Sequence, residues 1–247
     1  MSRVLIGIDD TDNLESRGTG FRARQLGQTI EVAGLGILEG ITRHQLFFDR
    51  RIPYTSHNSS ACLEFLSDDL PGIINISRDF LLRESAEGSD AGLAAALFEQ
   101  TDEEIMEWGL RAKKEILTQS EARDIAKRKS IFLEGLTGSH DGIIGSLAAI
   151  GLRKGGNDGR YIGVGKKEIR ELEGIYTVQQ LFREIRIDTI TDQAGHEIPD
   201  HHRIHIGHWM RPVLVKNKIT IIVEQAINNQ NYEWTAATKD FIKGISG

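Results

Sequence analysis

The chain has 247 residues with 30 Lys and Arg against 36 Asp and Glu, so its formal net charge is −6 at pH 7. That length provides a buried core for one large domain or two small ones, and the negative charge excludes a uniformly basic nucleic-acid-binding protein. The single cysteine, Cys62, excludes an intramolecular disulfide and a cysteine-based zinc ribbon. No stretch approaches the roughly 20 apolar residues that span a bilayer, and the apolar run at 4–8 is too short for a signal peptide. We therefore expect a cytoplasmic protein with no membrane partner.

The N-terminal segment is an apolar run that ends in three carboxylates, Asp9, Asp10 and Asp12. Acids packed at the end of a buried strand repel one another unless a cation neutralises them. Oxygen ligands without a nearby cysteine suit Mg²⁺, which binds one or two carboxylates together with phosphate oxygens. We therefore interpret the three residues as candidate magnesium ligands, and Asp10 and Asp12 as candidate catalytic residues. The alternative is an Asp-rich turn stabilised by side chain to backbone hydrogen bonds.

An aspartyl-phosphate mechanism is a minor alternative for the same segment. Asp10 and Asp12 have the spacing of a nucleophile and a second acid after a buried strand, but Leu14 occupies the place of the expected Thr or Val. No downstream acidic motif supports this mechanism.

The first hundred residues predict the element order strand, helix, strand, strand, helix, strand. Pro71 stands near the start of the second helix, where proline is tolerated best. This order is typical of the ferredoxin-like split βαβ unit. After the first strand at 4–8, the expected elements are a helix at 21–32, strands at 37–48 and 61–66, a helix at 72–83 and a strand at 90–98.

The rest of the chain predicts an α+β fold with a β-rich end. Residues 102–129 favour a helix capped by Thr101 and broken at 118–120, followed by a strand at 131–136 and a helix at 141–152. A glycine-rich loop at 153–165 surrounds a short strand. We place a boundary between 1–165 and 166–247; the second part contains a helix at 177–185 and strands at 187–191, 203–206, 212–215 and 219–223.

Glycines and hydroxyls at two helix starts predict a phosphate site. Helix N-termini present unpaired amides, and glycine allows a phosphate to approach closely. Side chains of the polar loop at 53–60 add donors for a phosphate or ribose, and Tyr54 could stack on a base. The open alternatives are a glycine-eased loop, close helix-to-sheet packing and an ordinary polar turn. The candidate nucleotide-binding residues are Gly18, Thr19, Asn58, Ser59, Gly142, Gly145 and Ser146.

Two further clusters have both functional and ordinary interpretations. Five of the eight histidines fall between His196 and His208, which suggests zinc, although solvated histidines are the default because no His-Glu-x-x-His motif is present. Basic residues could form a local RNA patch, although such residues are more often a solvated helix face. These residues are Arg123, Lys127, Arg128, Lys129, Lys166 and Lys167.

The motifs together resemble a known family. In order and spacing, four segments look like successive motifs of the archaeal tRNA-isoleucine agmatinylcytidine synthetases, over roughly the first 165 residues and faintly at 212–223. The segments are Gly7-Ile8-Asp9-Asp10-Thr11-Asp12, Ser16-Arg17-Gly18, Ile52-Pro53-Tyr54 with its polar loop, and the glycine-rich run 142–151.

This resemblance implies a kinase-like α/β part that uses ATP and magnesium, joined to a ferredoxin-like βαββαβ unit. It further implies that Asp9, Asp10 and Asp12 hold magnesium and that Gly18, Asn58, Gly142 and Gly145 line the nucleotide. The family enzymes also carry an OB-fold and a zinc ribbon, for which this chain has neither the length nor the cysteines. The resemblance therefore extends to the ATP–magnesium core and not to the complete agmatinylation reaction.

Three hypotheses about function follow. The first is an ATP- and magnesium-dependent phosphotransferase-like enzyme whose acceptor the sequence does not identify. The second is a non-catalytic nucleotide or metal sensor that uses the same cleft. The third is an RNA-binding adaptor that relies on local basic residues.

Overall fold

The computed structural model describes residues 1–53, 55, 57–163, 169–227 and 231–246. It divides into two compact units, unit 1 at Met1–Gly155 and unit 2 at Gly156–Gly247. The expected boundary at 165/166 lies later, and Lys166 is outside the described residues. The units divide earlier because β6 (Arg160–Gly163) pairs with β10 (Val213–Val215), a strand of the C-terminal unit. The fold is α+β, as the sequence predicts.

Unit 1 is built on an antiparallel sheet with strand order β5-β4-β1-β3-β2. The central strand β1 pairs with β3 on one side and with β4 on the other, and β5 extends the sheet beyond β4. Its first six elements, β1-α1-β2-β3-α2-β4, have the ferredoxin-like connectivity that the sequence predicts. The strands are β1 (Ser2–Asp9), β2 (Ile37–Gln45), β3 (Ser59–Ser67), β4 (Gly92–Leu97) and β5 (Phe132–Gly135).

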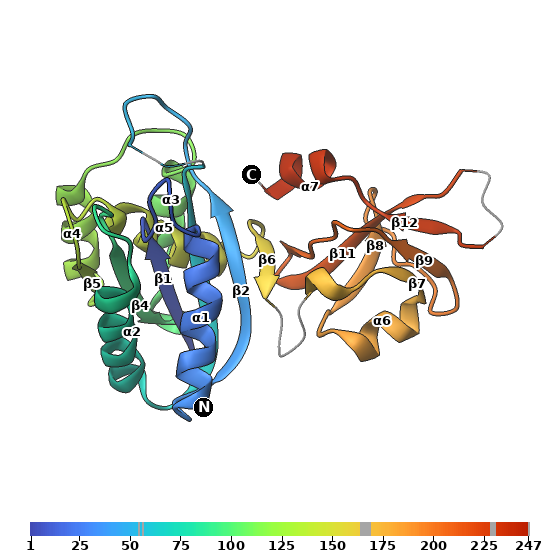
Figure 1. Ribbon diagram of the computed structural model, residues 1–247, viewed down its shortest axis with the longest axis horizontal. Helices are drawn as coiled ribbons and strands as arrows, with labels where there is room; N and C mark the ends of the chain where they lie inside the picture. Colours follow the sequence, from blue (N-terminus) through green and yellow to red (C-terminus); the bar gives the residue numbers. More distant parts are fainter. Residues whose placement is uncertain (54, 56, 164–168, 228–230, 247) are drawn as a thin grey trace. The chain divides into compact units, whose positions relative to one another are not determined.

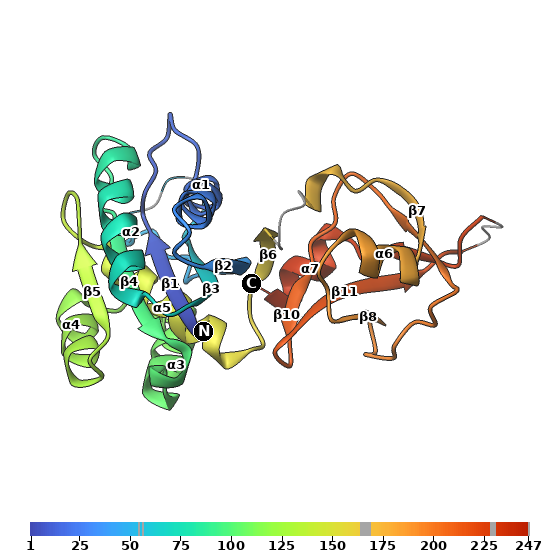
Figure 2. The ribbon, with the colours of Figure 1, turned by 90° about the horizontal axis from the view of Figure 1, so that it is seen from below.

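Helices cover both faces of this sheet (Figures 1 and 2). The helices α1 (Thr19–Val32) and α2 (Leu70–Glu84) lie on one face; α3 (Glu103–Arg111), α4 (Gln119–Arg128) and α5 (Gly142–Gly155) lie on the other. Side chains alternate along β1, so Leu5 joins the core beneath α5 while Ile6 points to the face of α1 and α2. Because both faces are covered, the interior of β1 is fully buried.

The backbone of α5 rests directly on the sheet, because glycines remove the side chains between them. A Cβ at Gly7 of β1 would overlap the carbonyl group of Ser146, and one at Gly92 of β4 would overlap the carbonyl group of Gly142. This close approach fixes the first turn of α5 beside the C-terminal end of β1. The acidic turn after β1 and the glycine-rich start of α5, which the sequence analysis proposed as binding segments, therefore lie side by side.

The helix boundaries correct two predictions. Asp102, not Thr101, caps α3: its Oδ1 accepts from the amides of Glu104 at 3.1 Å and Ile105 at 3.4 Å, whereas the buried Thr101 hydroxyl donates to the carbonyl of Leu97 at 3.3 Å. The helix α5 extends to Gly155, so Arg153 is helical and not in a loop. Its buried guanidinium forms an ion pair with Glu64 of β3.

Unit 2 is a mixed sheet with strand order β6-β10-β11-β12-β9-β7, in which β8 pairs in parallel with β11. Ile204, Ile221 and Val223 form its core together with Leu181 of α6. The sequence did not predict β7, β12 or α7, since segments this short carry little hydrophobic periodicity. The remaining elements are β7 (Gly174–Thr177), α6 (Val178–Glu184), β8 (Thr189–Asp192), β9 (Arg203–Ile206), β11 (Lys218–Gln225), β12 (Trp234–Ala236) and α7 (Lys239–Ser246).

Two short 3₁₀ helices, Phe98–Gln100 and Ile169–Glu171, complete the elements. In the described part of the chain, every helix is too short or too polar to cross a membrane.

Candidate functional site

A pocket of about 210 Å³ opens in unit 1 where β1 ends. The first turns of α1 and α5 and the loop between β2 and β3 contribute to its walls. Most residues that the sequence proposed for metal or nucleotide binding line this pocket: Asp9, Asp10, Asp12, Thr19, Asn58, Ser59, Gly142 and Gly145. The fold therefore brings together segments that are far apart in the chain.

Two of the proposed residues have other positions. Ser146 is fully buried; its hydroxyl donates to the carbonyl of Ile143 at 3.1 Å, and its own carbonyl faces Gly7. Gly18 is exposed and precedes α1, where a Cβ would lie 3.8 Å from Oδ2 of Asp12. Ser146 packs α5 onto β1, and Gly18 borders the lining of the pocket.

Asp10 occupies an uncommon backbone conformation at the point where β1 breaks. Its φ is 52°, in the left-handed region that Asp and Asn tolerate better than most residues. Burial, followed by repulsion from Asp90, Asp12 and Asp141, raises its pKa to about 7. Protonation or a cation would relieve this repulsion.

Asp9, the last residue of β1, is more deeply enclosed. Burial raises its pKa well above the ordinary value, and the neighbouring Asp10 adds to the effect. A Cβ at Gly145 of α5 would overlap its carboxylate, so this glycine makes room for it. Arg43 lies close enough to oppose this rise, and burial lowers the pKa of the arginine itself.

Asp12 is held by threonines from two segments. Its Oδ1 accepts from the hydroxyl of Thr19 at 2.8 Å and from the Thr19 amide at 3.2 Å, and its Oδ2 accepts from the hydroxyl of Thr55 at 2.9 Å. The Thr19 hydroxyl also lies 3.2 Å from that of the buried Thr11. Asp12 therefore connects the acidic turn to the start of α1 and to the β2–β3 loop.

The donor chemistry of this corner fits a hard divalent cation. The acidic side chains here offer carboxylate oxygens as ligands. Mg²⁺ binds one or two carboxylates together with phosphate oxygens and water. Among the described residues, no group of three or more His, Cys, Asp or Glu side chains is arranged as a complete metal site.

The start of α5 faces these acids. Gly142 and Gly145 lie in its first turns and line the pocket, and both are buried: the backbone of Asp90 and Gly92 fills the side-chain position of Gly142, and the Asp9 carboxylate fills that of Gly145. The amides of Gly142, Ile143 and Ile144 already donate to backbone carbonyls, so the start of α5 offers an anion the positive end of its dipole rather than free donors. Asp141 adds a carboxylate, which the side-chain amide of Gln119 approaches at 2.7 Å.

The polar loop contributes positioned side chains. The side-chain amide of Asn58 donates to the carbonyl of Phe47 at 2.8 Å, and the hydroxyl of Ser59 accepts from Nε of Arg43 at 2.9 Å. These contacts hold the loop against the end of β2. Tyr54 and Ser56 lie outside the described residues.

The sequence analysis did not identify several residues of this corner. Asp90 and Asp141 act electrostatically on Asp10, while Arg43 and Thr55 act on Asp9 and Asp12. The signal for Asp90 was available, because it lies two residues before β4, the strand that pairs with β1. Asp141 lies within the glycine motif of α5, but no role was given to it.

The histidines of unit 2 are engaged with different partners. Nδ1 of His202 accepts from the indole of Trp234 at 2.9 Å, and the ring of His205 stacks on Tyr232 at 5.0 Å. His196 pairs with Asp192 at 2.9 Å, and His208 with Glu173 at 3.2 Å. In the described chain they do not combine into a metal-binding group.

Two of the four described residues of the proposed basic patch are neutralised by acids. Arg128 pairs with Glu104, and Lys129 with both Asp102 at 2.6 Å and Glu104 at 2.9 Å. This pattern agrees with a solvated face of α4. Lys166 and Lys167 are outside the described residues.

Comparisons with known proteins match part of the chain. No known family model matches it. The chain is 31% identical over 157 residues to the uncharacterized protein MJ0921 of Methanocaldococcus jannaschii, covering 62% of this chain and 50% of that protein. It thus spans half the length of this curated relative.

Two solved structures share the fold over a similar portion. The crystal structure of TiaS, a tRNA agmatidine synthetase, in complex with an isoleucine tRNA and ATP has a TM-score of 0.54 at 23% identity, over 61% of this chain and 36% of that chain. A tRNA fluorescent labeling enzyme has a TM-score of 0.52 at 25% identity, over 60% and 36%. About three fifths of this chain therefore resembles TiaS in fold, which confirms the resemblance predicted from the motifs.

Proposed function

We propose that unit 1 binds ATP together with Mg²⁺ and transfers a phosphoryl group to an RNA acceptor. One observation carries this proposal: the carboxylates at the end of β1 and the glycine-bearing start of α5 line the same pocket. A cation and the positive end of a helix dipole both stabilise a triphosphate, and this pocket offers candidates for both.

Asp9 and Asp10 would hold the ion, which supplies neutralisation of the phosphate oxygens when it is bound. The positive end of the α5 dipole would favour the triphosphate, because this helix begins at the pocket with Gly142. Asp12 would keep the acidic turn in register with α1, because Thr19 and Thr55 fix both of its oxygens. The chain's residues act here mainly by positioning and by electrostatics.

The choice of RNA as acceptor rests on the likeness to TiaS, one structure of which is a complex with a tRNA and ATP. This chain covers about a third of that protein, so only the ATP-dependent step is proposed and not the complete agmatine chemistry. RNA as the acceptor therefore rests on this likeness, whereas nucleotide binding rests on the pocket.

A nucleotide sensor that uses the same pocket is the second candidate. The raised pKa of Asp10 favours a sensor, because binding of an ion would by itself change the charge of this corner without any transfer step. The two candidates differ in turnover, because a sensor binds ATP and Mg²⁺ but releases the nucleotide unchanged.

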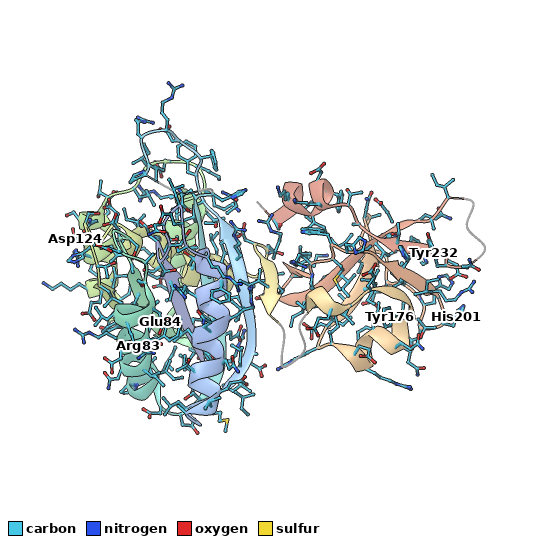
Figure 3. All side chains as sticks on the ribbon, in the orientation of Figure 1. Arg83, Glu84, Asp124, Tyr176, His201 and Tyr232 are labelled. Atoms are coloured by element: carbon cyan, nitrogen blue, oxygen red, sulfur yellow. The ribbon has the colours of Figure 1, made fainter. Side chains whose placement is uncertain are left out.

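The test is phosphoryl transfer from γ-labelled ATP to bulk tRNA in the presence and absence of Mg²⁺. We expect label on the RNA, or hydrolysis stimulated by RNA, with magnesium and the unaltered chain. Asp10→Asn should lower the rate by about a hundredfold, the scale of losing one charge-stabilising group. The matched control Asp124→Asn changes an exposed carboxylate on α4 (Figure 3) and should leave the rate unchanged.

ATP binding without any transfer or hydrolysis would support the sensor and contradict the enzyme. A rate that is equal in Asp10→Asn and in the unaltered chain would contradict the assignment of the site.

A further inference from the structure

An aromatic ring surrounded by guanidinium groups lies at the start of α1. The Cζ atoms of Arg17, Arg22 and Arg24 are 4.5, 5.8 and 5.9 Å from the centroid of the Phe21 ring. Arg17 is exposed and the other three side chains are half-buried. We refer to these four residues as the Phe21 cluster. Thr19, in the same turn of α1, lines the pocket.

Two arginines of this cluster, Arg17 and Arg22, differ from many others in the described chain by having no acidic partner. Within the part of the chain that the structure describes, neither Arg17 nor Arg22 forms an ion pair. Nη1 of Arg22 donates to Oε1 of Gln25 at 2.9 Å, while its shielded Nε has no acceptor. Arginines paired with carboxylates elsewhere are Arg3, Arg51, Arg78, Arg83, Arg111, Arg128, Arg153 and Arg203.

The geometry of the cluster indicates the class of ligand. A guanidinium above an aromatic ring uses the face of its plane for that contact and keeps its N–H donors at the edge. Those donors match the paired oxygens of a phosphate. Because several guanidiniums surround one ring, the cluster can contact more than one phosphate, which favours a polymer over a single small anion.

The charge of the surroundings supports the same conclusion. Unit 1 carries an excess of acidic residues, and the pocket beside the cluster contains Asp9, Asp10 and Asp12. A polyanionic acceptor would be repelled from this region unless a local positive surface held it. The Phe21 cluster is such a surface, at the margin of the pocket.

We propose that the Phe21 cluster is the docking surface for a single-stranded RNA segment that enters the pocket. This inference rests on the proposed function and identifies the residues that hold the acceptor. Arg17 and Arg22 bind phosphates of the RNA backbone, and Phe21 keeps the guanidinium of Arg17 in place. The surface contacts the phosphate backbone and not the bases, so it binds RNAs of different sequence with similar affinity.

A matched site elsewhere in unit 1, on α2, provides the control. Arg83 of α2 also lies above a phenylalanine, at 5.9 Å from the Phe80 centroid, but it is paired with Glu84 at 2.9 Å (Figure 3). Arg83→Gln therefore removes the same charge and the same type of ring contact from a neutralised site.

The experiment measures binding of a fluorescein-labelled, unstructured RNA of about 15 nucleotides by anisotropy over a range of salt concentrations. We expect Arg17→Gln and Arg22→Gln each to weaken binding about fivefold and to reduce the slope of log affinity against log salt by about 0.7, the value for one phosphate contact on a single strand. Arg83→Gln should keep the affinity and slope of the unaltered chain. Thermal unfolding of each variant checks that the fold is retained.

Equal RNA affinity in Arg17→Gln, Arg22→Gln and the unaltered chain would overturn the inference. So would loss, in these variants, of binding to phosphatidylserine vesicles with RNA binding unchanged. ATP turnover is measured in parallel. If the unaltered chain neither binds nor uses ATP but the two variants still lose RNA, the proposed function fails and the docking surface stands. If ATP is used and RNA affinity does not depend on Arg17 or Arg22, the docking surface fails and the ATP assignment stands.

Discussion

Unit 1 and unit 2 distribute their charged residues differently. Unit 1 carries 18 of the 30 basic and 24 of the 36 acidic residues, while unit 2 carries 12 of each, so the whole net charge of −6 belongs to unit 1. In unit 1, acids gather at a pocket beside the start of α5, and the pKa of Asp10 is raised to about 7. In unit 2, histidines are hydrogen-bonded or stacked with separate partners. The acids of the candidate site thus repel one another, whereas the histidines of unit 2 each have a partner.

The substitution expected to change the stability of one unit most, relative to the other, is at Gly7. In Gly7→Ala, the new methyl group would overlap the carbonyl of Ser146, so α5 must move away from β1. We expect a loss of about 3 kcal/mol from unit 1, the scale of overpacking in a close-packed core, and no change in unit 2. Hydrogen exchange in mild denaturant, followed on peptides from each unit, measures both.

Gly155→Ala is the matched control, because a Cβ there meets nothing within 4 Å. This variant should keep its stability or gain a few tenths of a kcal/mol from higher helix propensity. Equal stability of Gly7→Ala and Gly155→Ala would show that α5 does not rest on β1 as described.

The next effect concerns the pH dependence of unit 1 without ligand. The folded pKa of Asp10 is about 7 against an ordinary 3.8, so the folded state binds more protons than the unfolded chain between these values. Stability should therefore fall as pH rises from about 4 to about 7 and stay low above that. Asp10→Asn, which tolerates the same φ, removes this penalty and should be about 1–2 kcal/mol more stable than the unaltered chain at pH 8.

Urea denaturation at pH 4 and pH 8 tests this, with Asp124→Asn as the exposed control. The stabilities of Asp10→Asn and the unaltered chain should converge at the lower pH. A variant that is less stable than the unaltered chain at pH 8 would mean that Asp10 is not under electrostatic strain.

The smallest effect is expected in unit 2. The indole of Trp234 donates to Nδ1 of His202 at 2.9 Å, and the two rings stack at 6.4 Å. Trp234→Phe loses this hydrogen bond and should destabilise unit 2 by about 1 kcal/mol. His201→Gln, a change at an exposed neighbour (Figure 3), should cost less than half as much.

Hydrogen exchange of unit 2 peptides resolves this difference. If the two variants have the same effect, the Trp234–His202 contact contributes no more than an exposed side chain.

The sequence predicted the fold of unit 1 better than that of unit 2. The apolar run of β1 and the proline at the start of α2 are local signals, and they indicated the ferredoxin-like order. The α5 boundary was missed because Arg153 is a charged residue whose burial depends on Glu64 of a distant strand. In unit 2, β7 and β12 are defined by pairing with β9, which a short segment does not encode locally.

The candidate site was predicted in outline for the same reason. Asp9, Asp10 and Asp12 follow one another in the chain, so their proximity needs no tertiary information. Asp90 and Asp141 reach Asp10 only through the pairing of β4 with β1 and the packing of α5. Conversely, the small side chain of Ser146 suggested a ligand contact, whereas tight packing of α5 on Gly7 accounts for it.

The proposed function depends most on whether the acidic corner holds a divalent ion beneath a triphosphate. The direct measurement is the thermal unfolding of unit 1 with ATP alone, Mg²⁺ alone and both, in the unaltered chain, Asp10→Asn and Asp124→Asn. We expect stabilisation of the unaltered chain and Asp124→Asn that requires both ligands, and none in Asp10→Asn. Equal stabilisation of Asp10→Asn by ATP and Mg²⁺ would contradict this assignment.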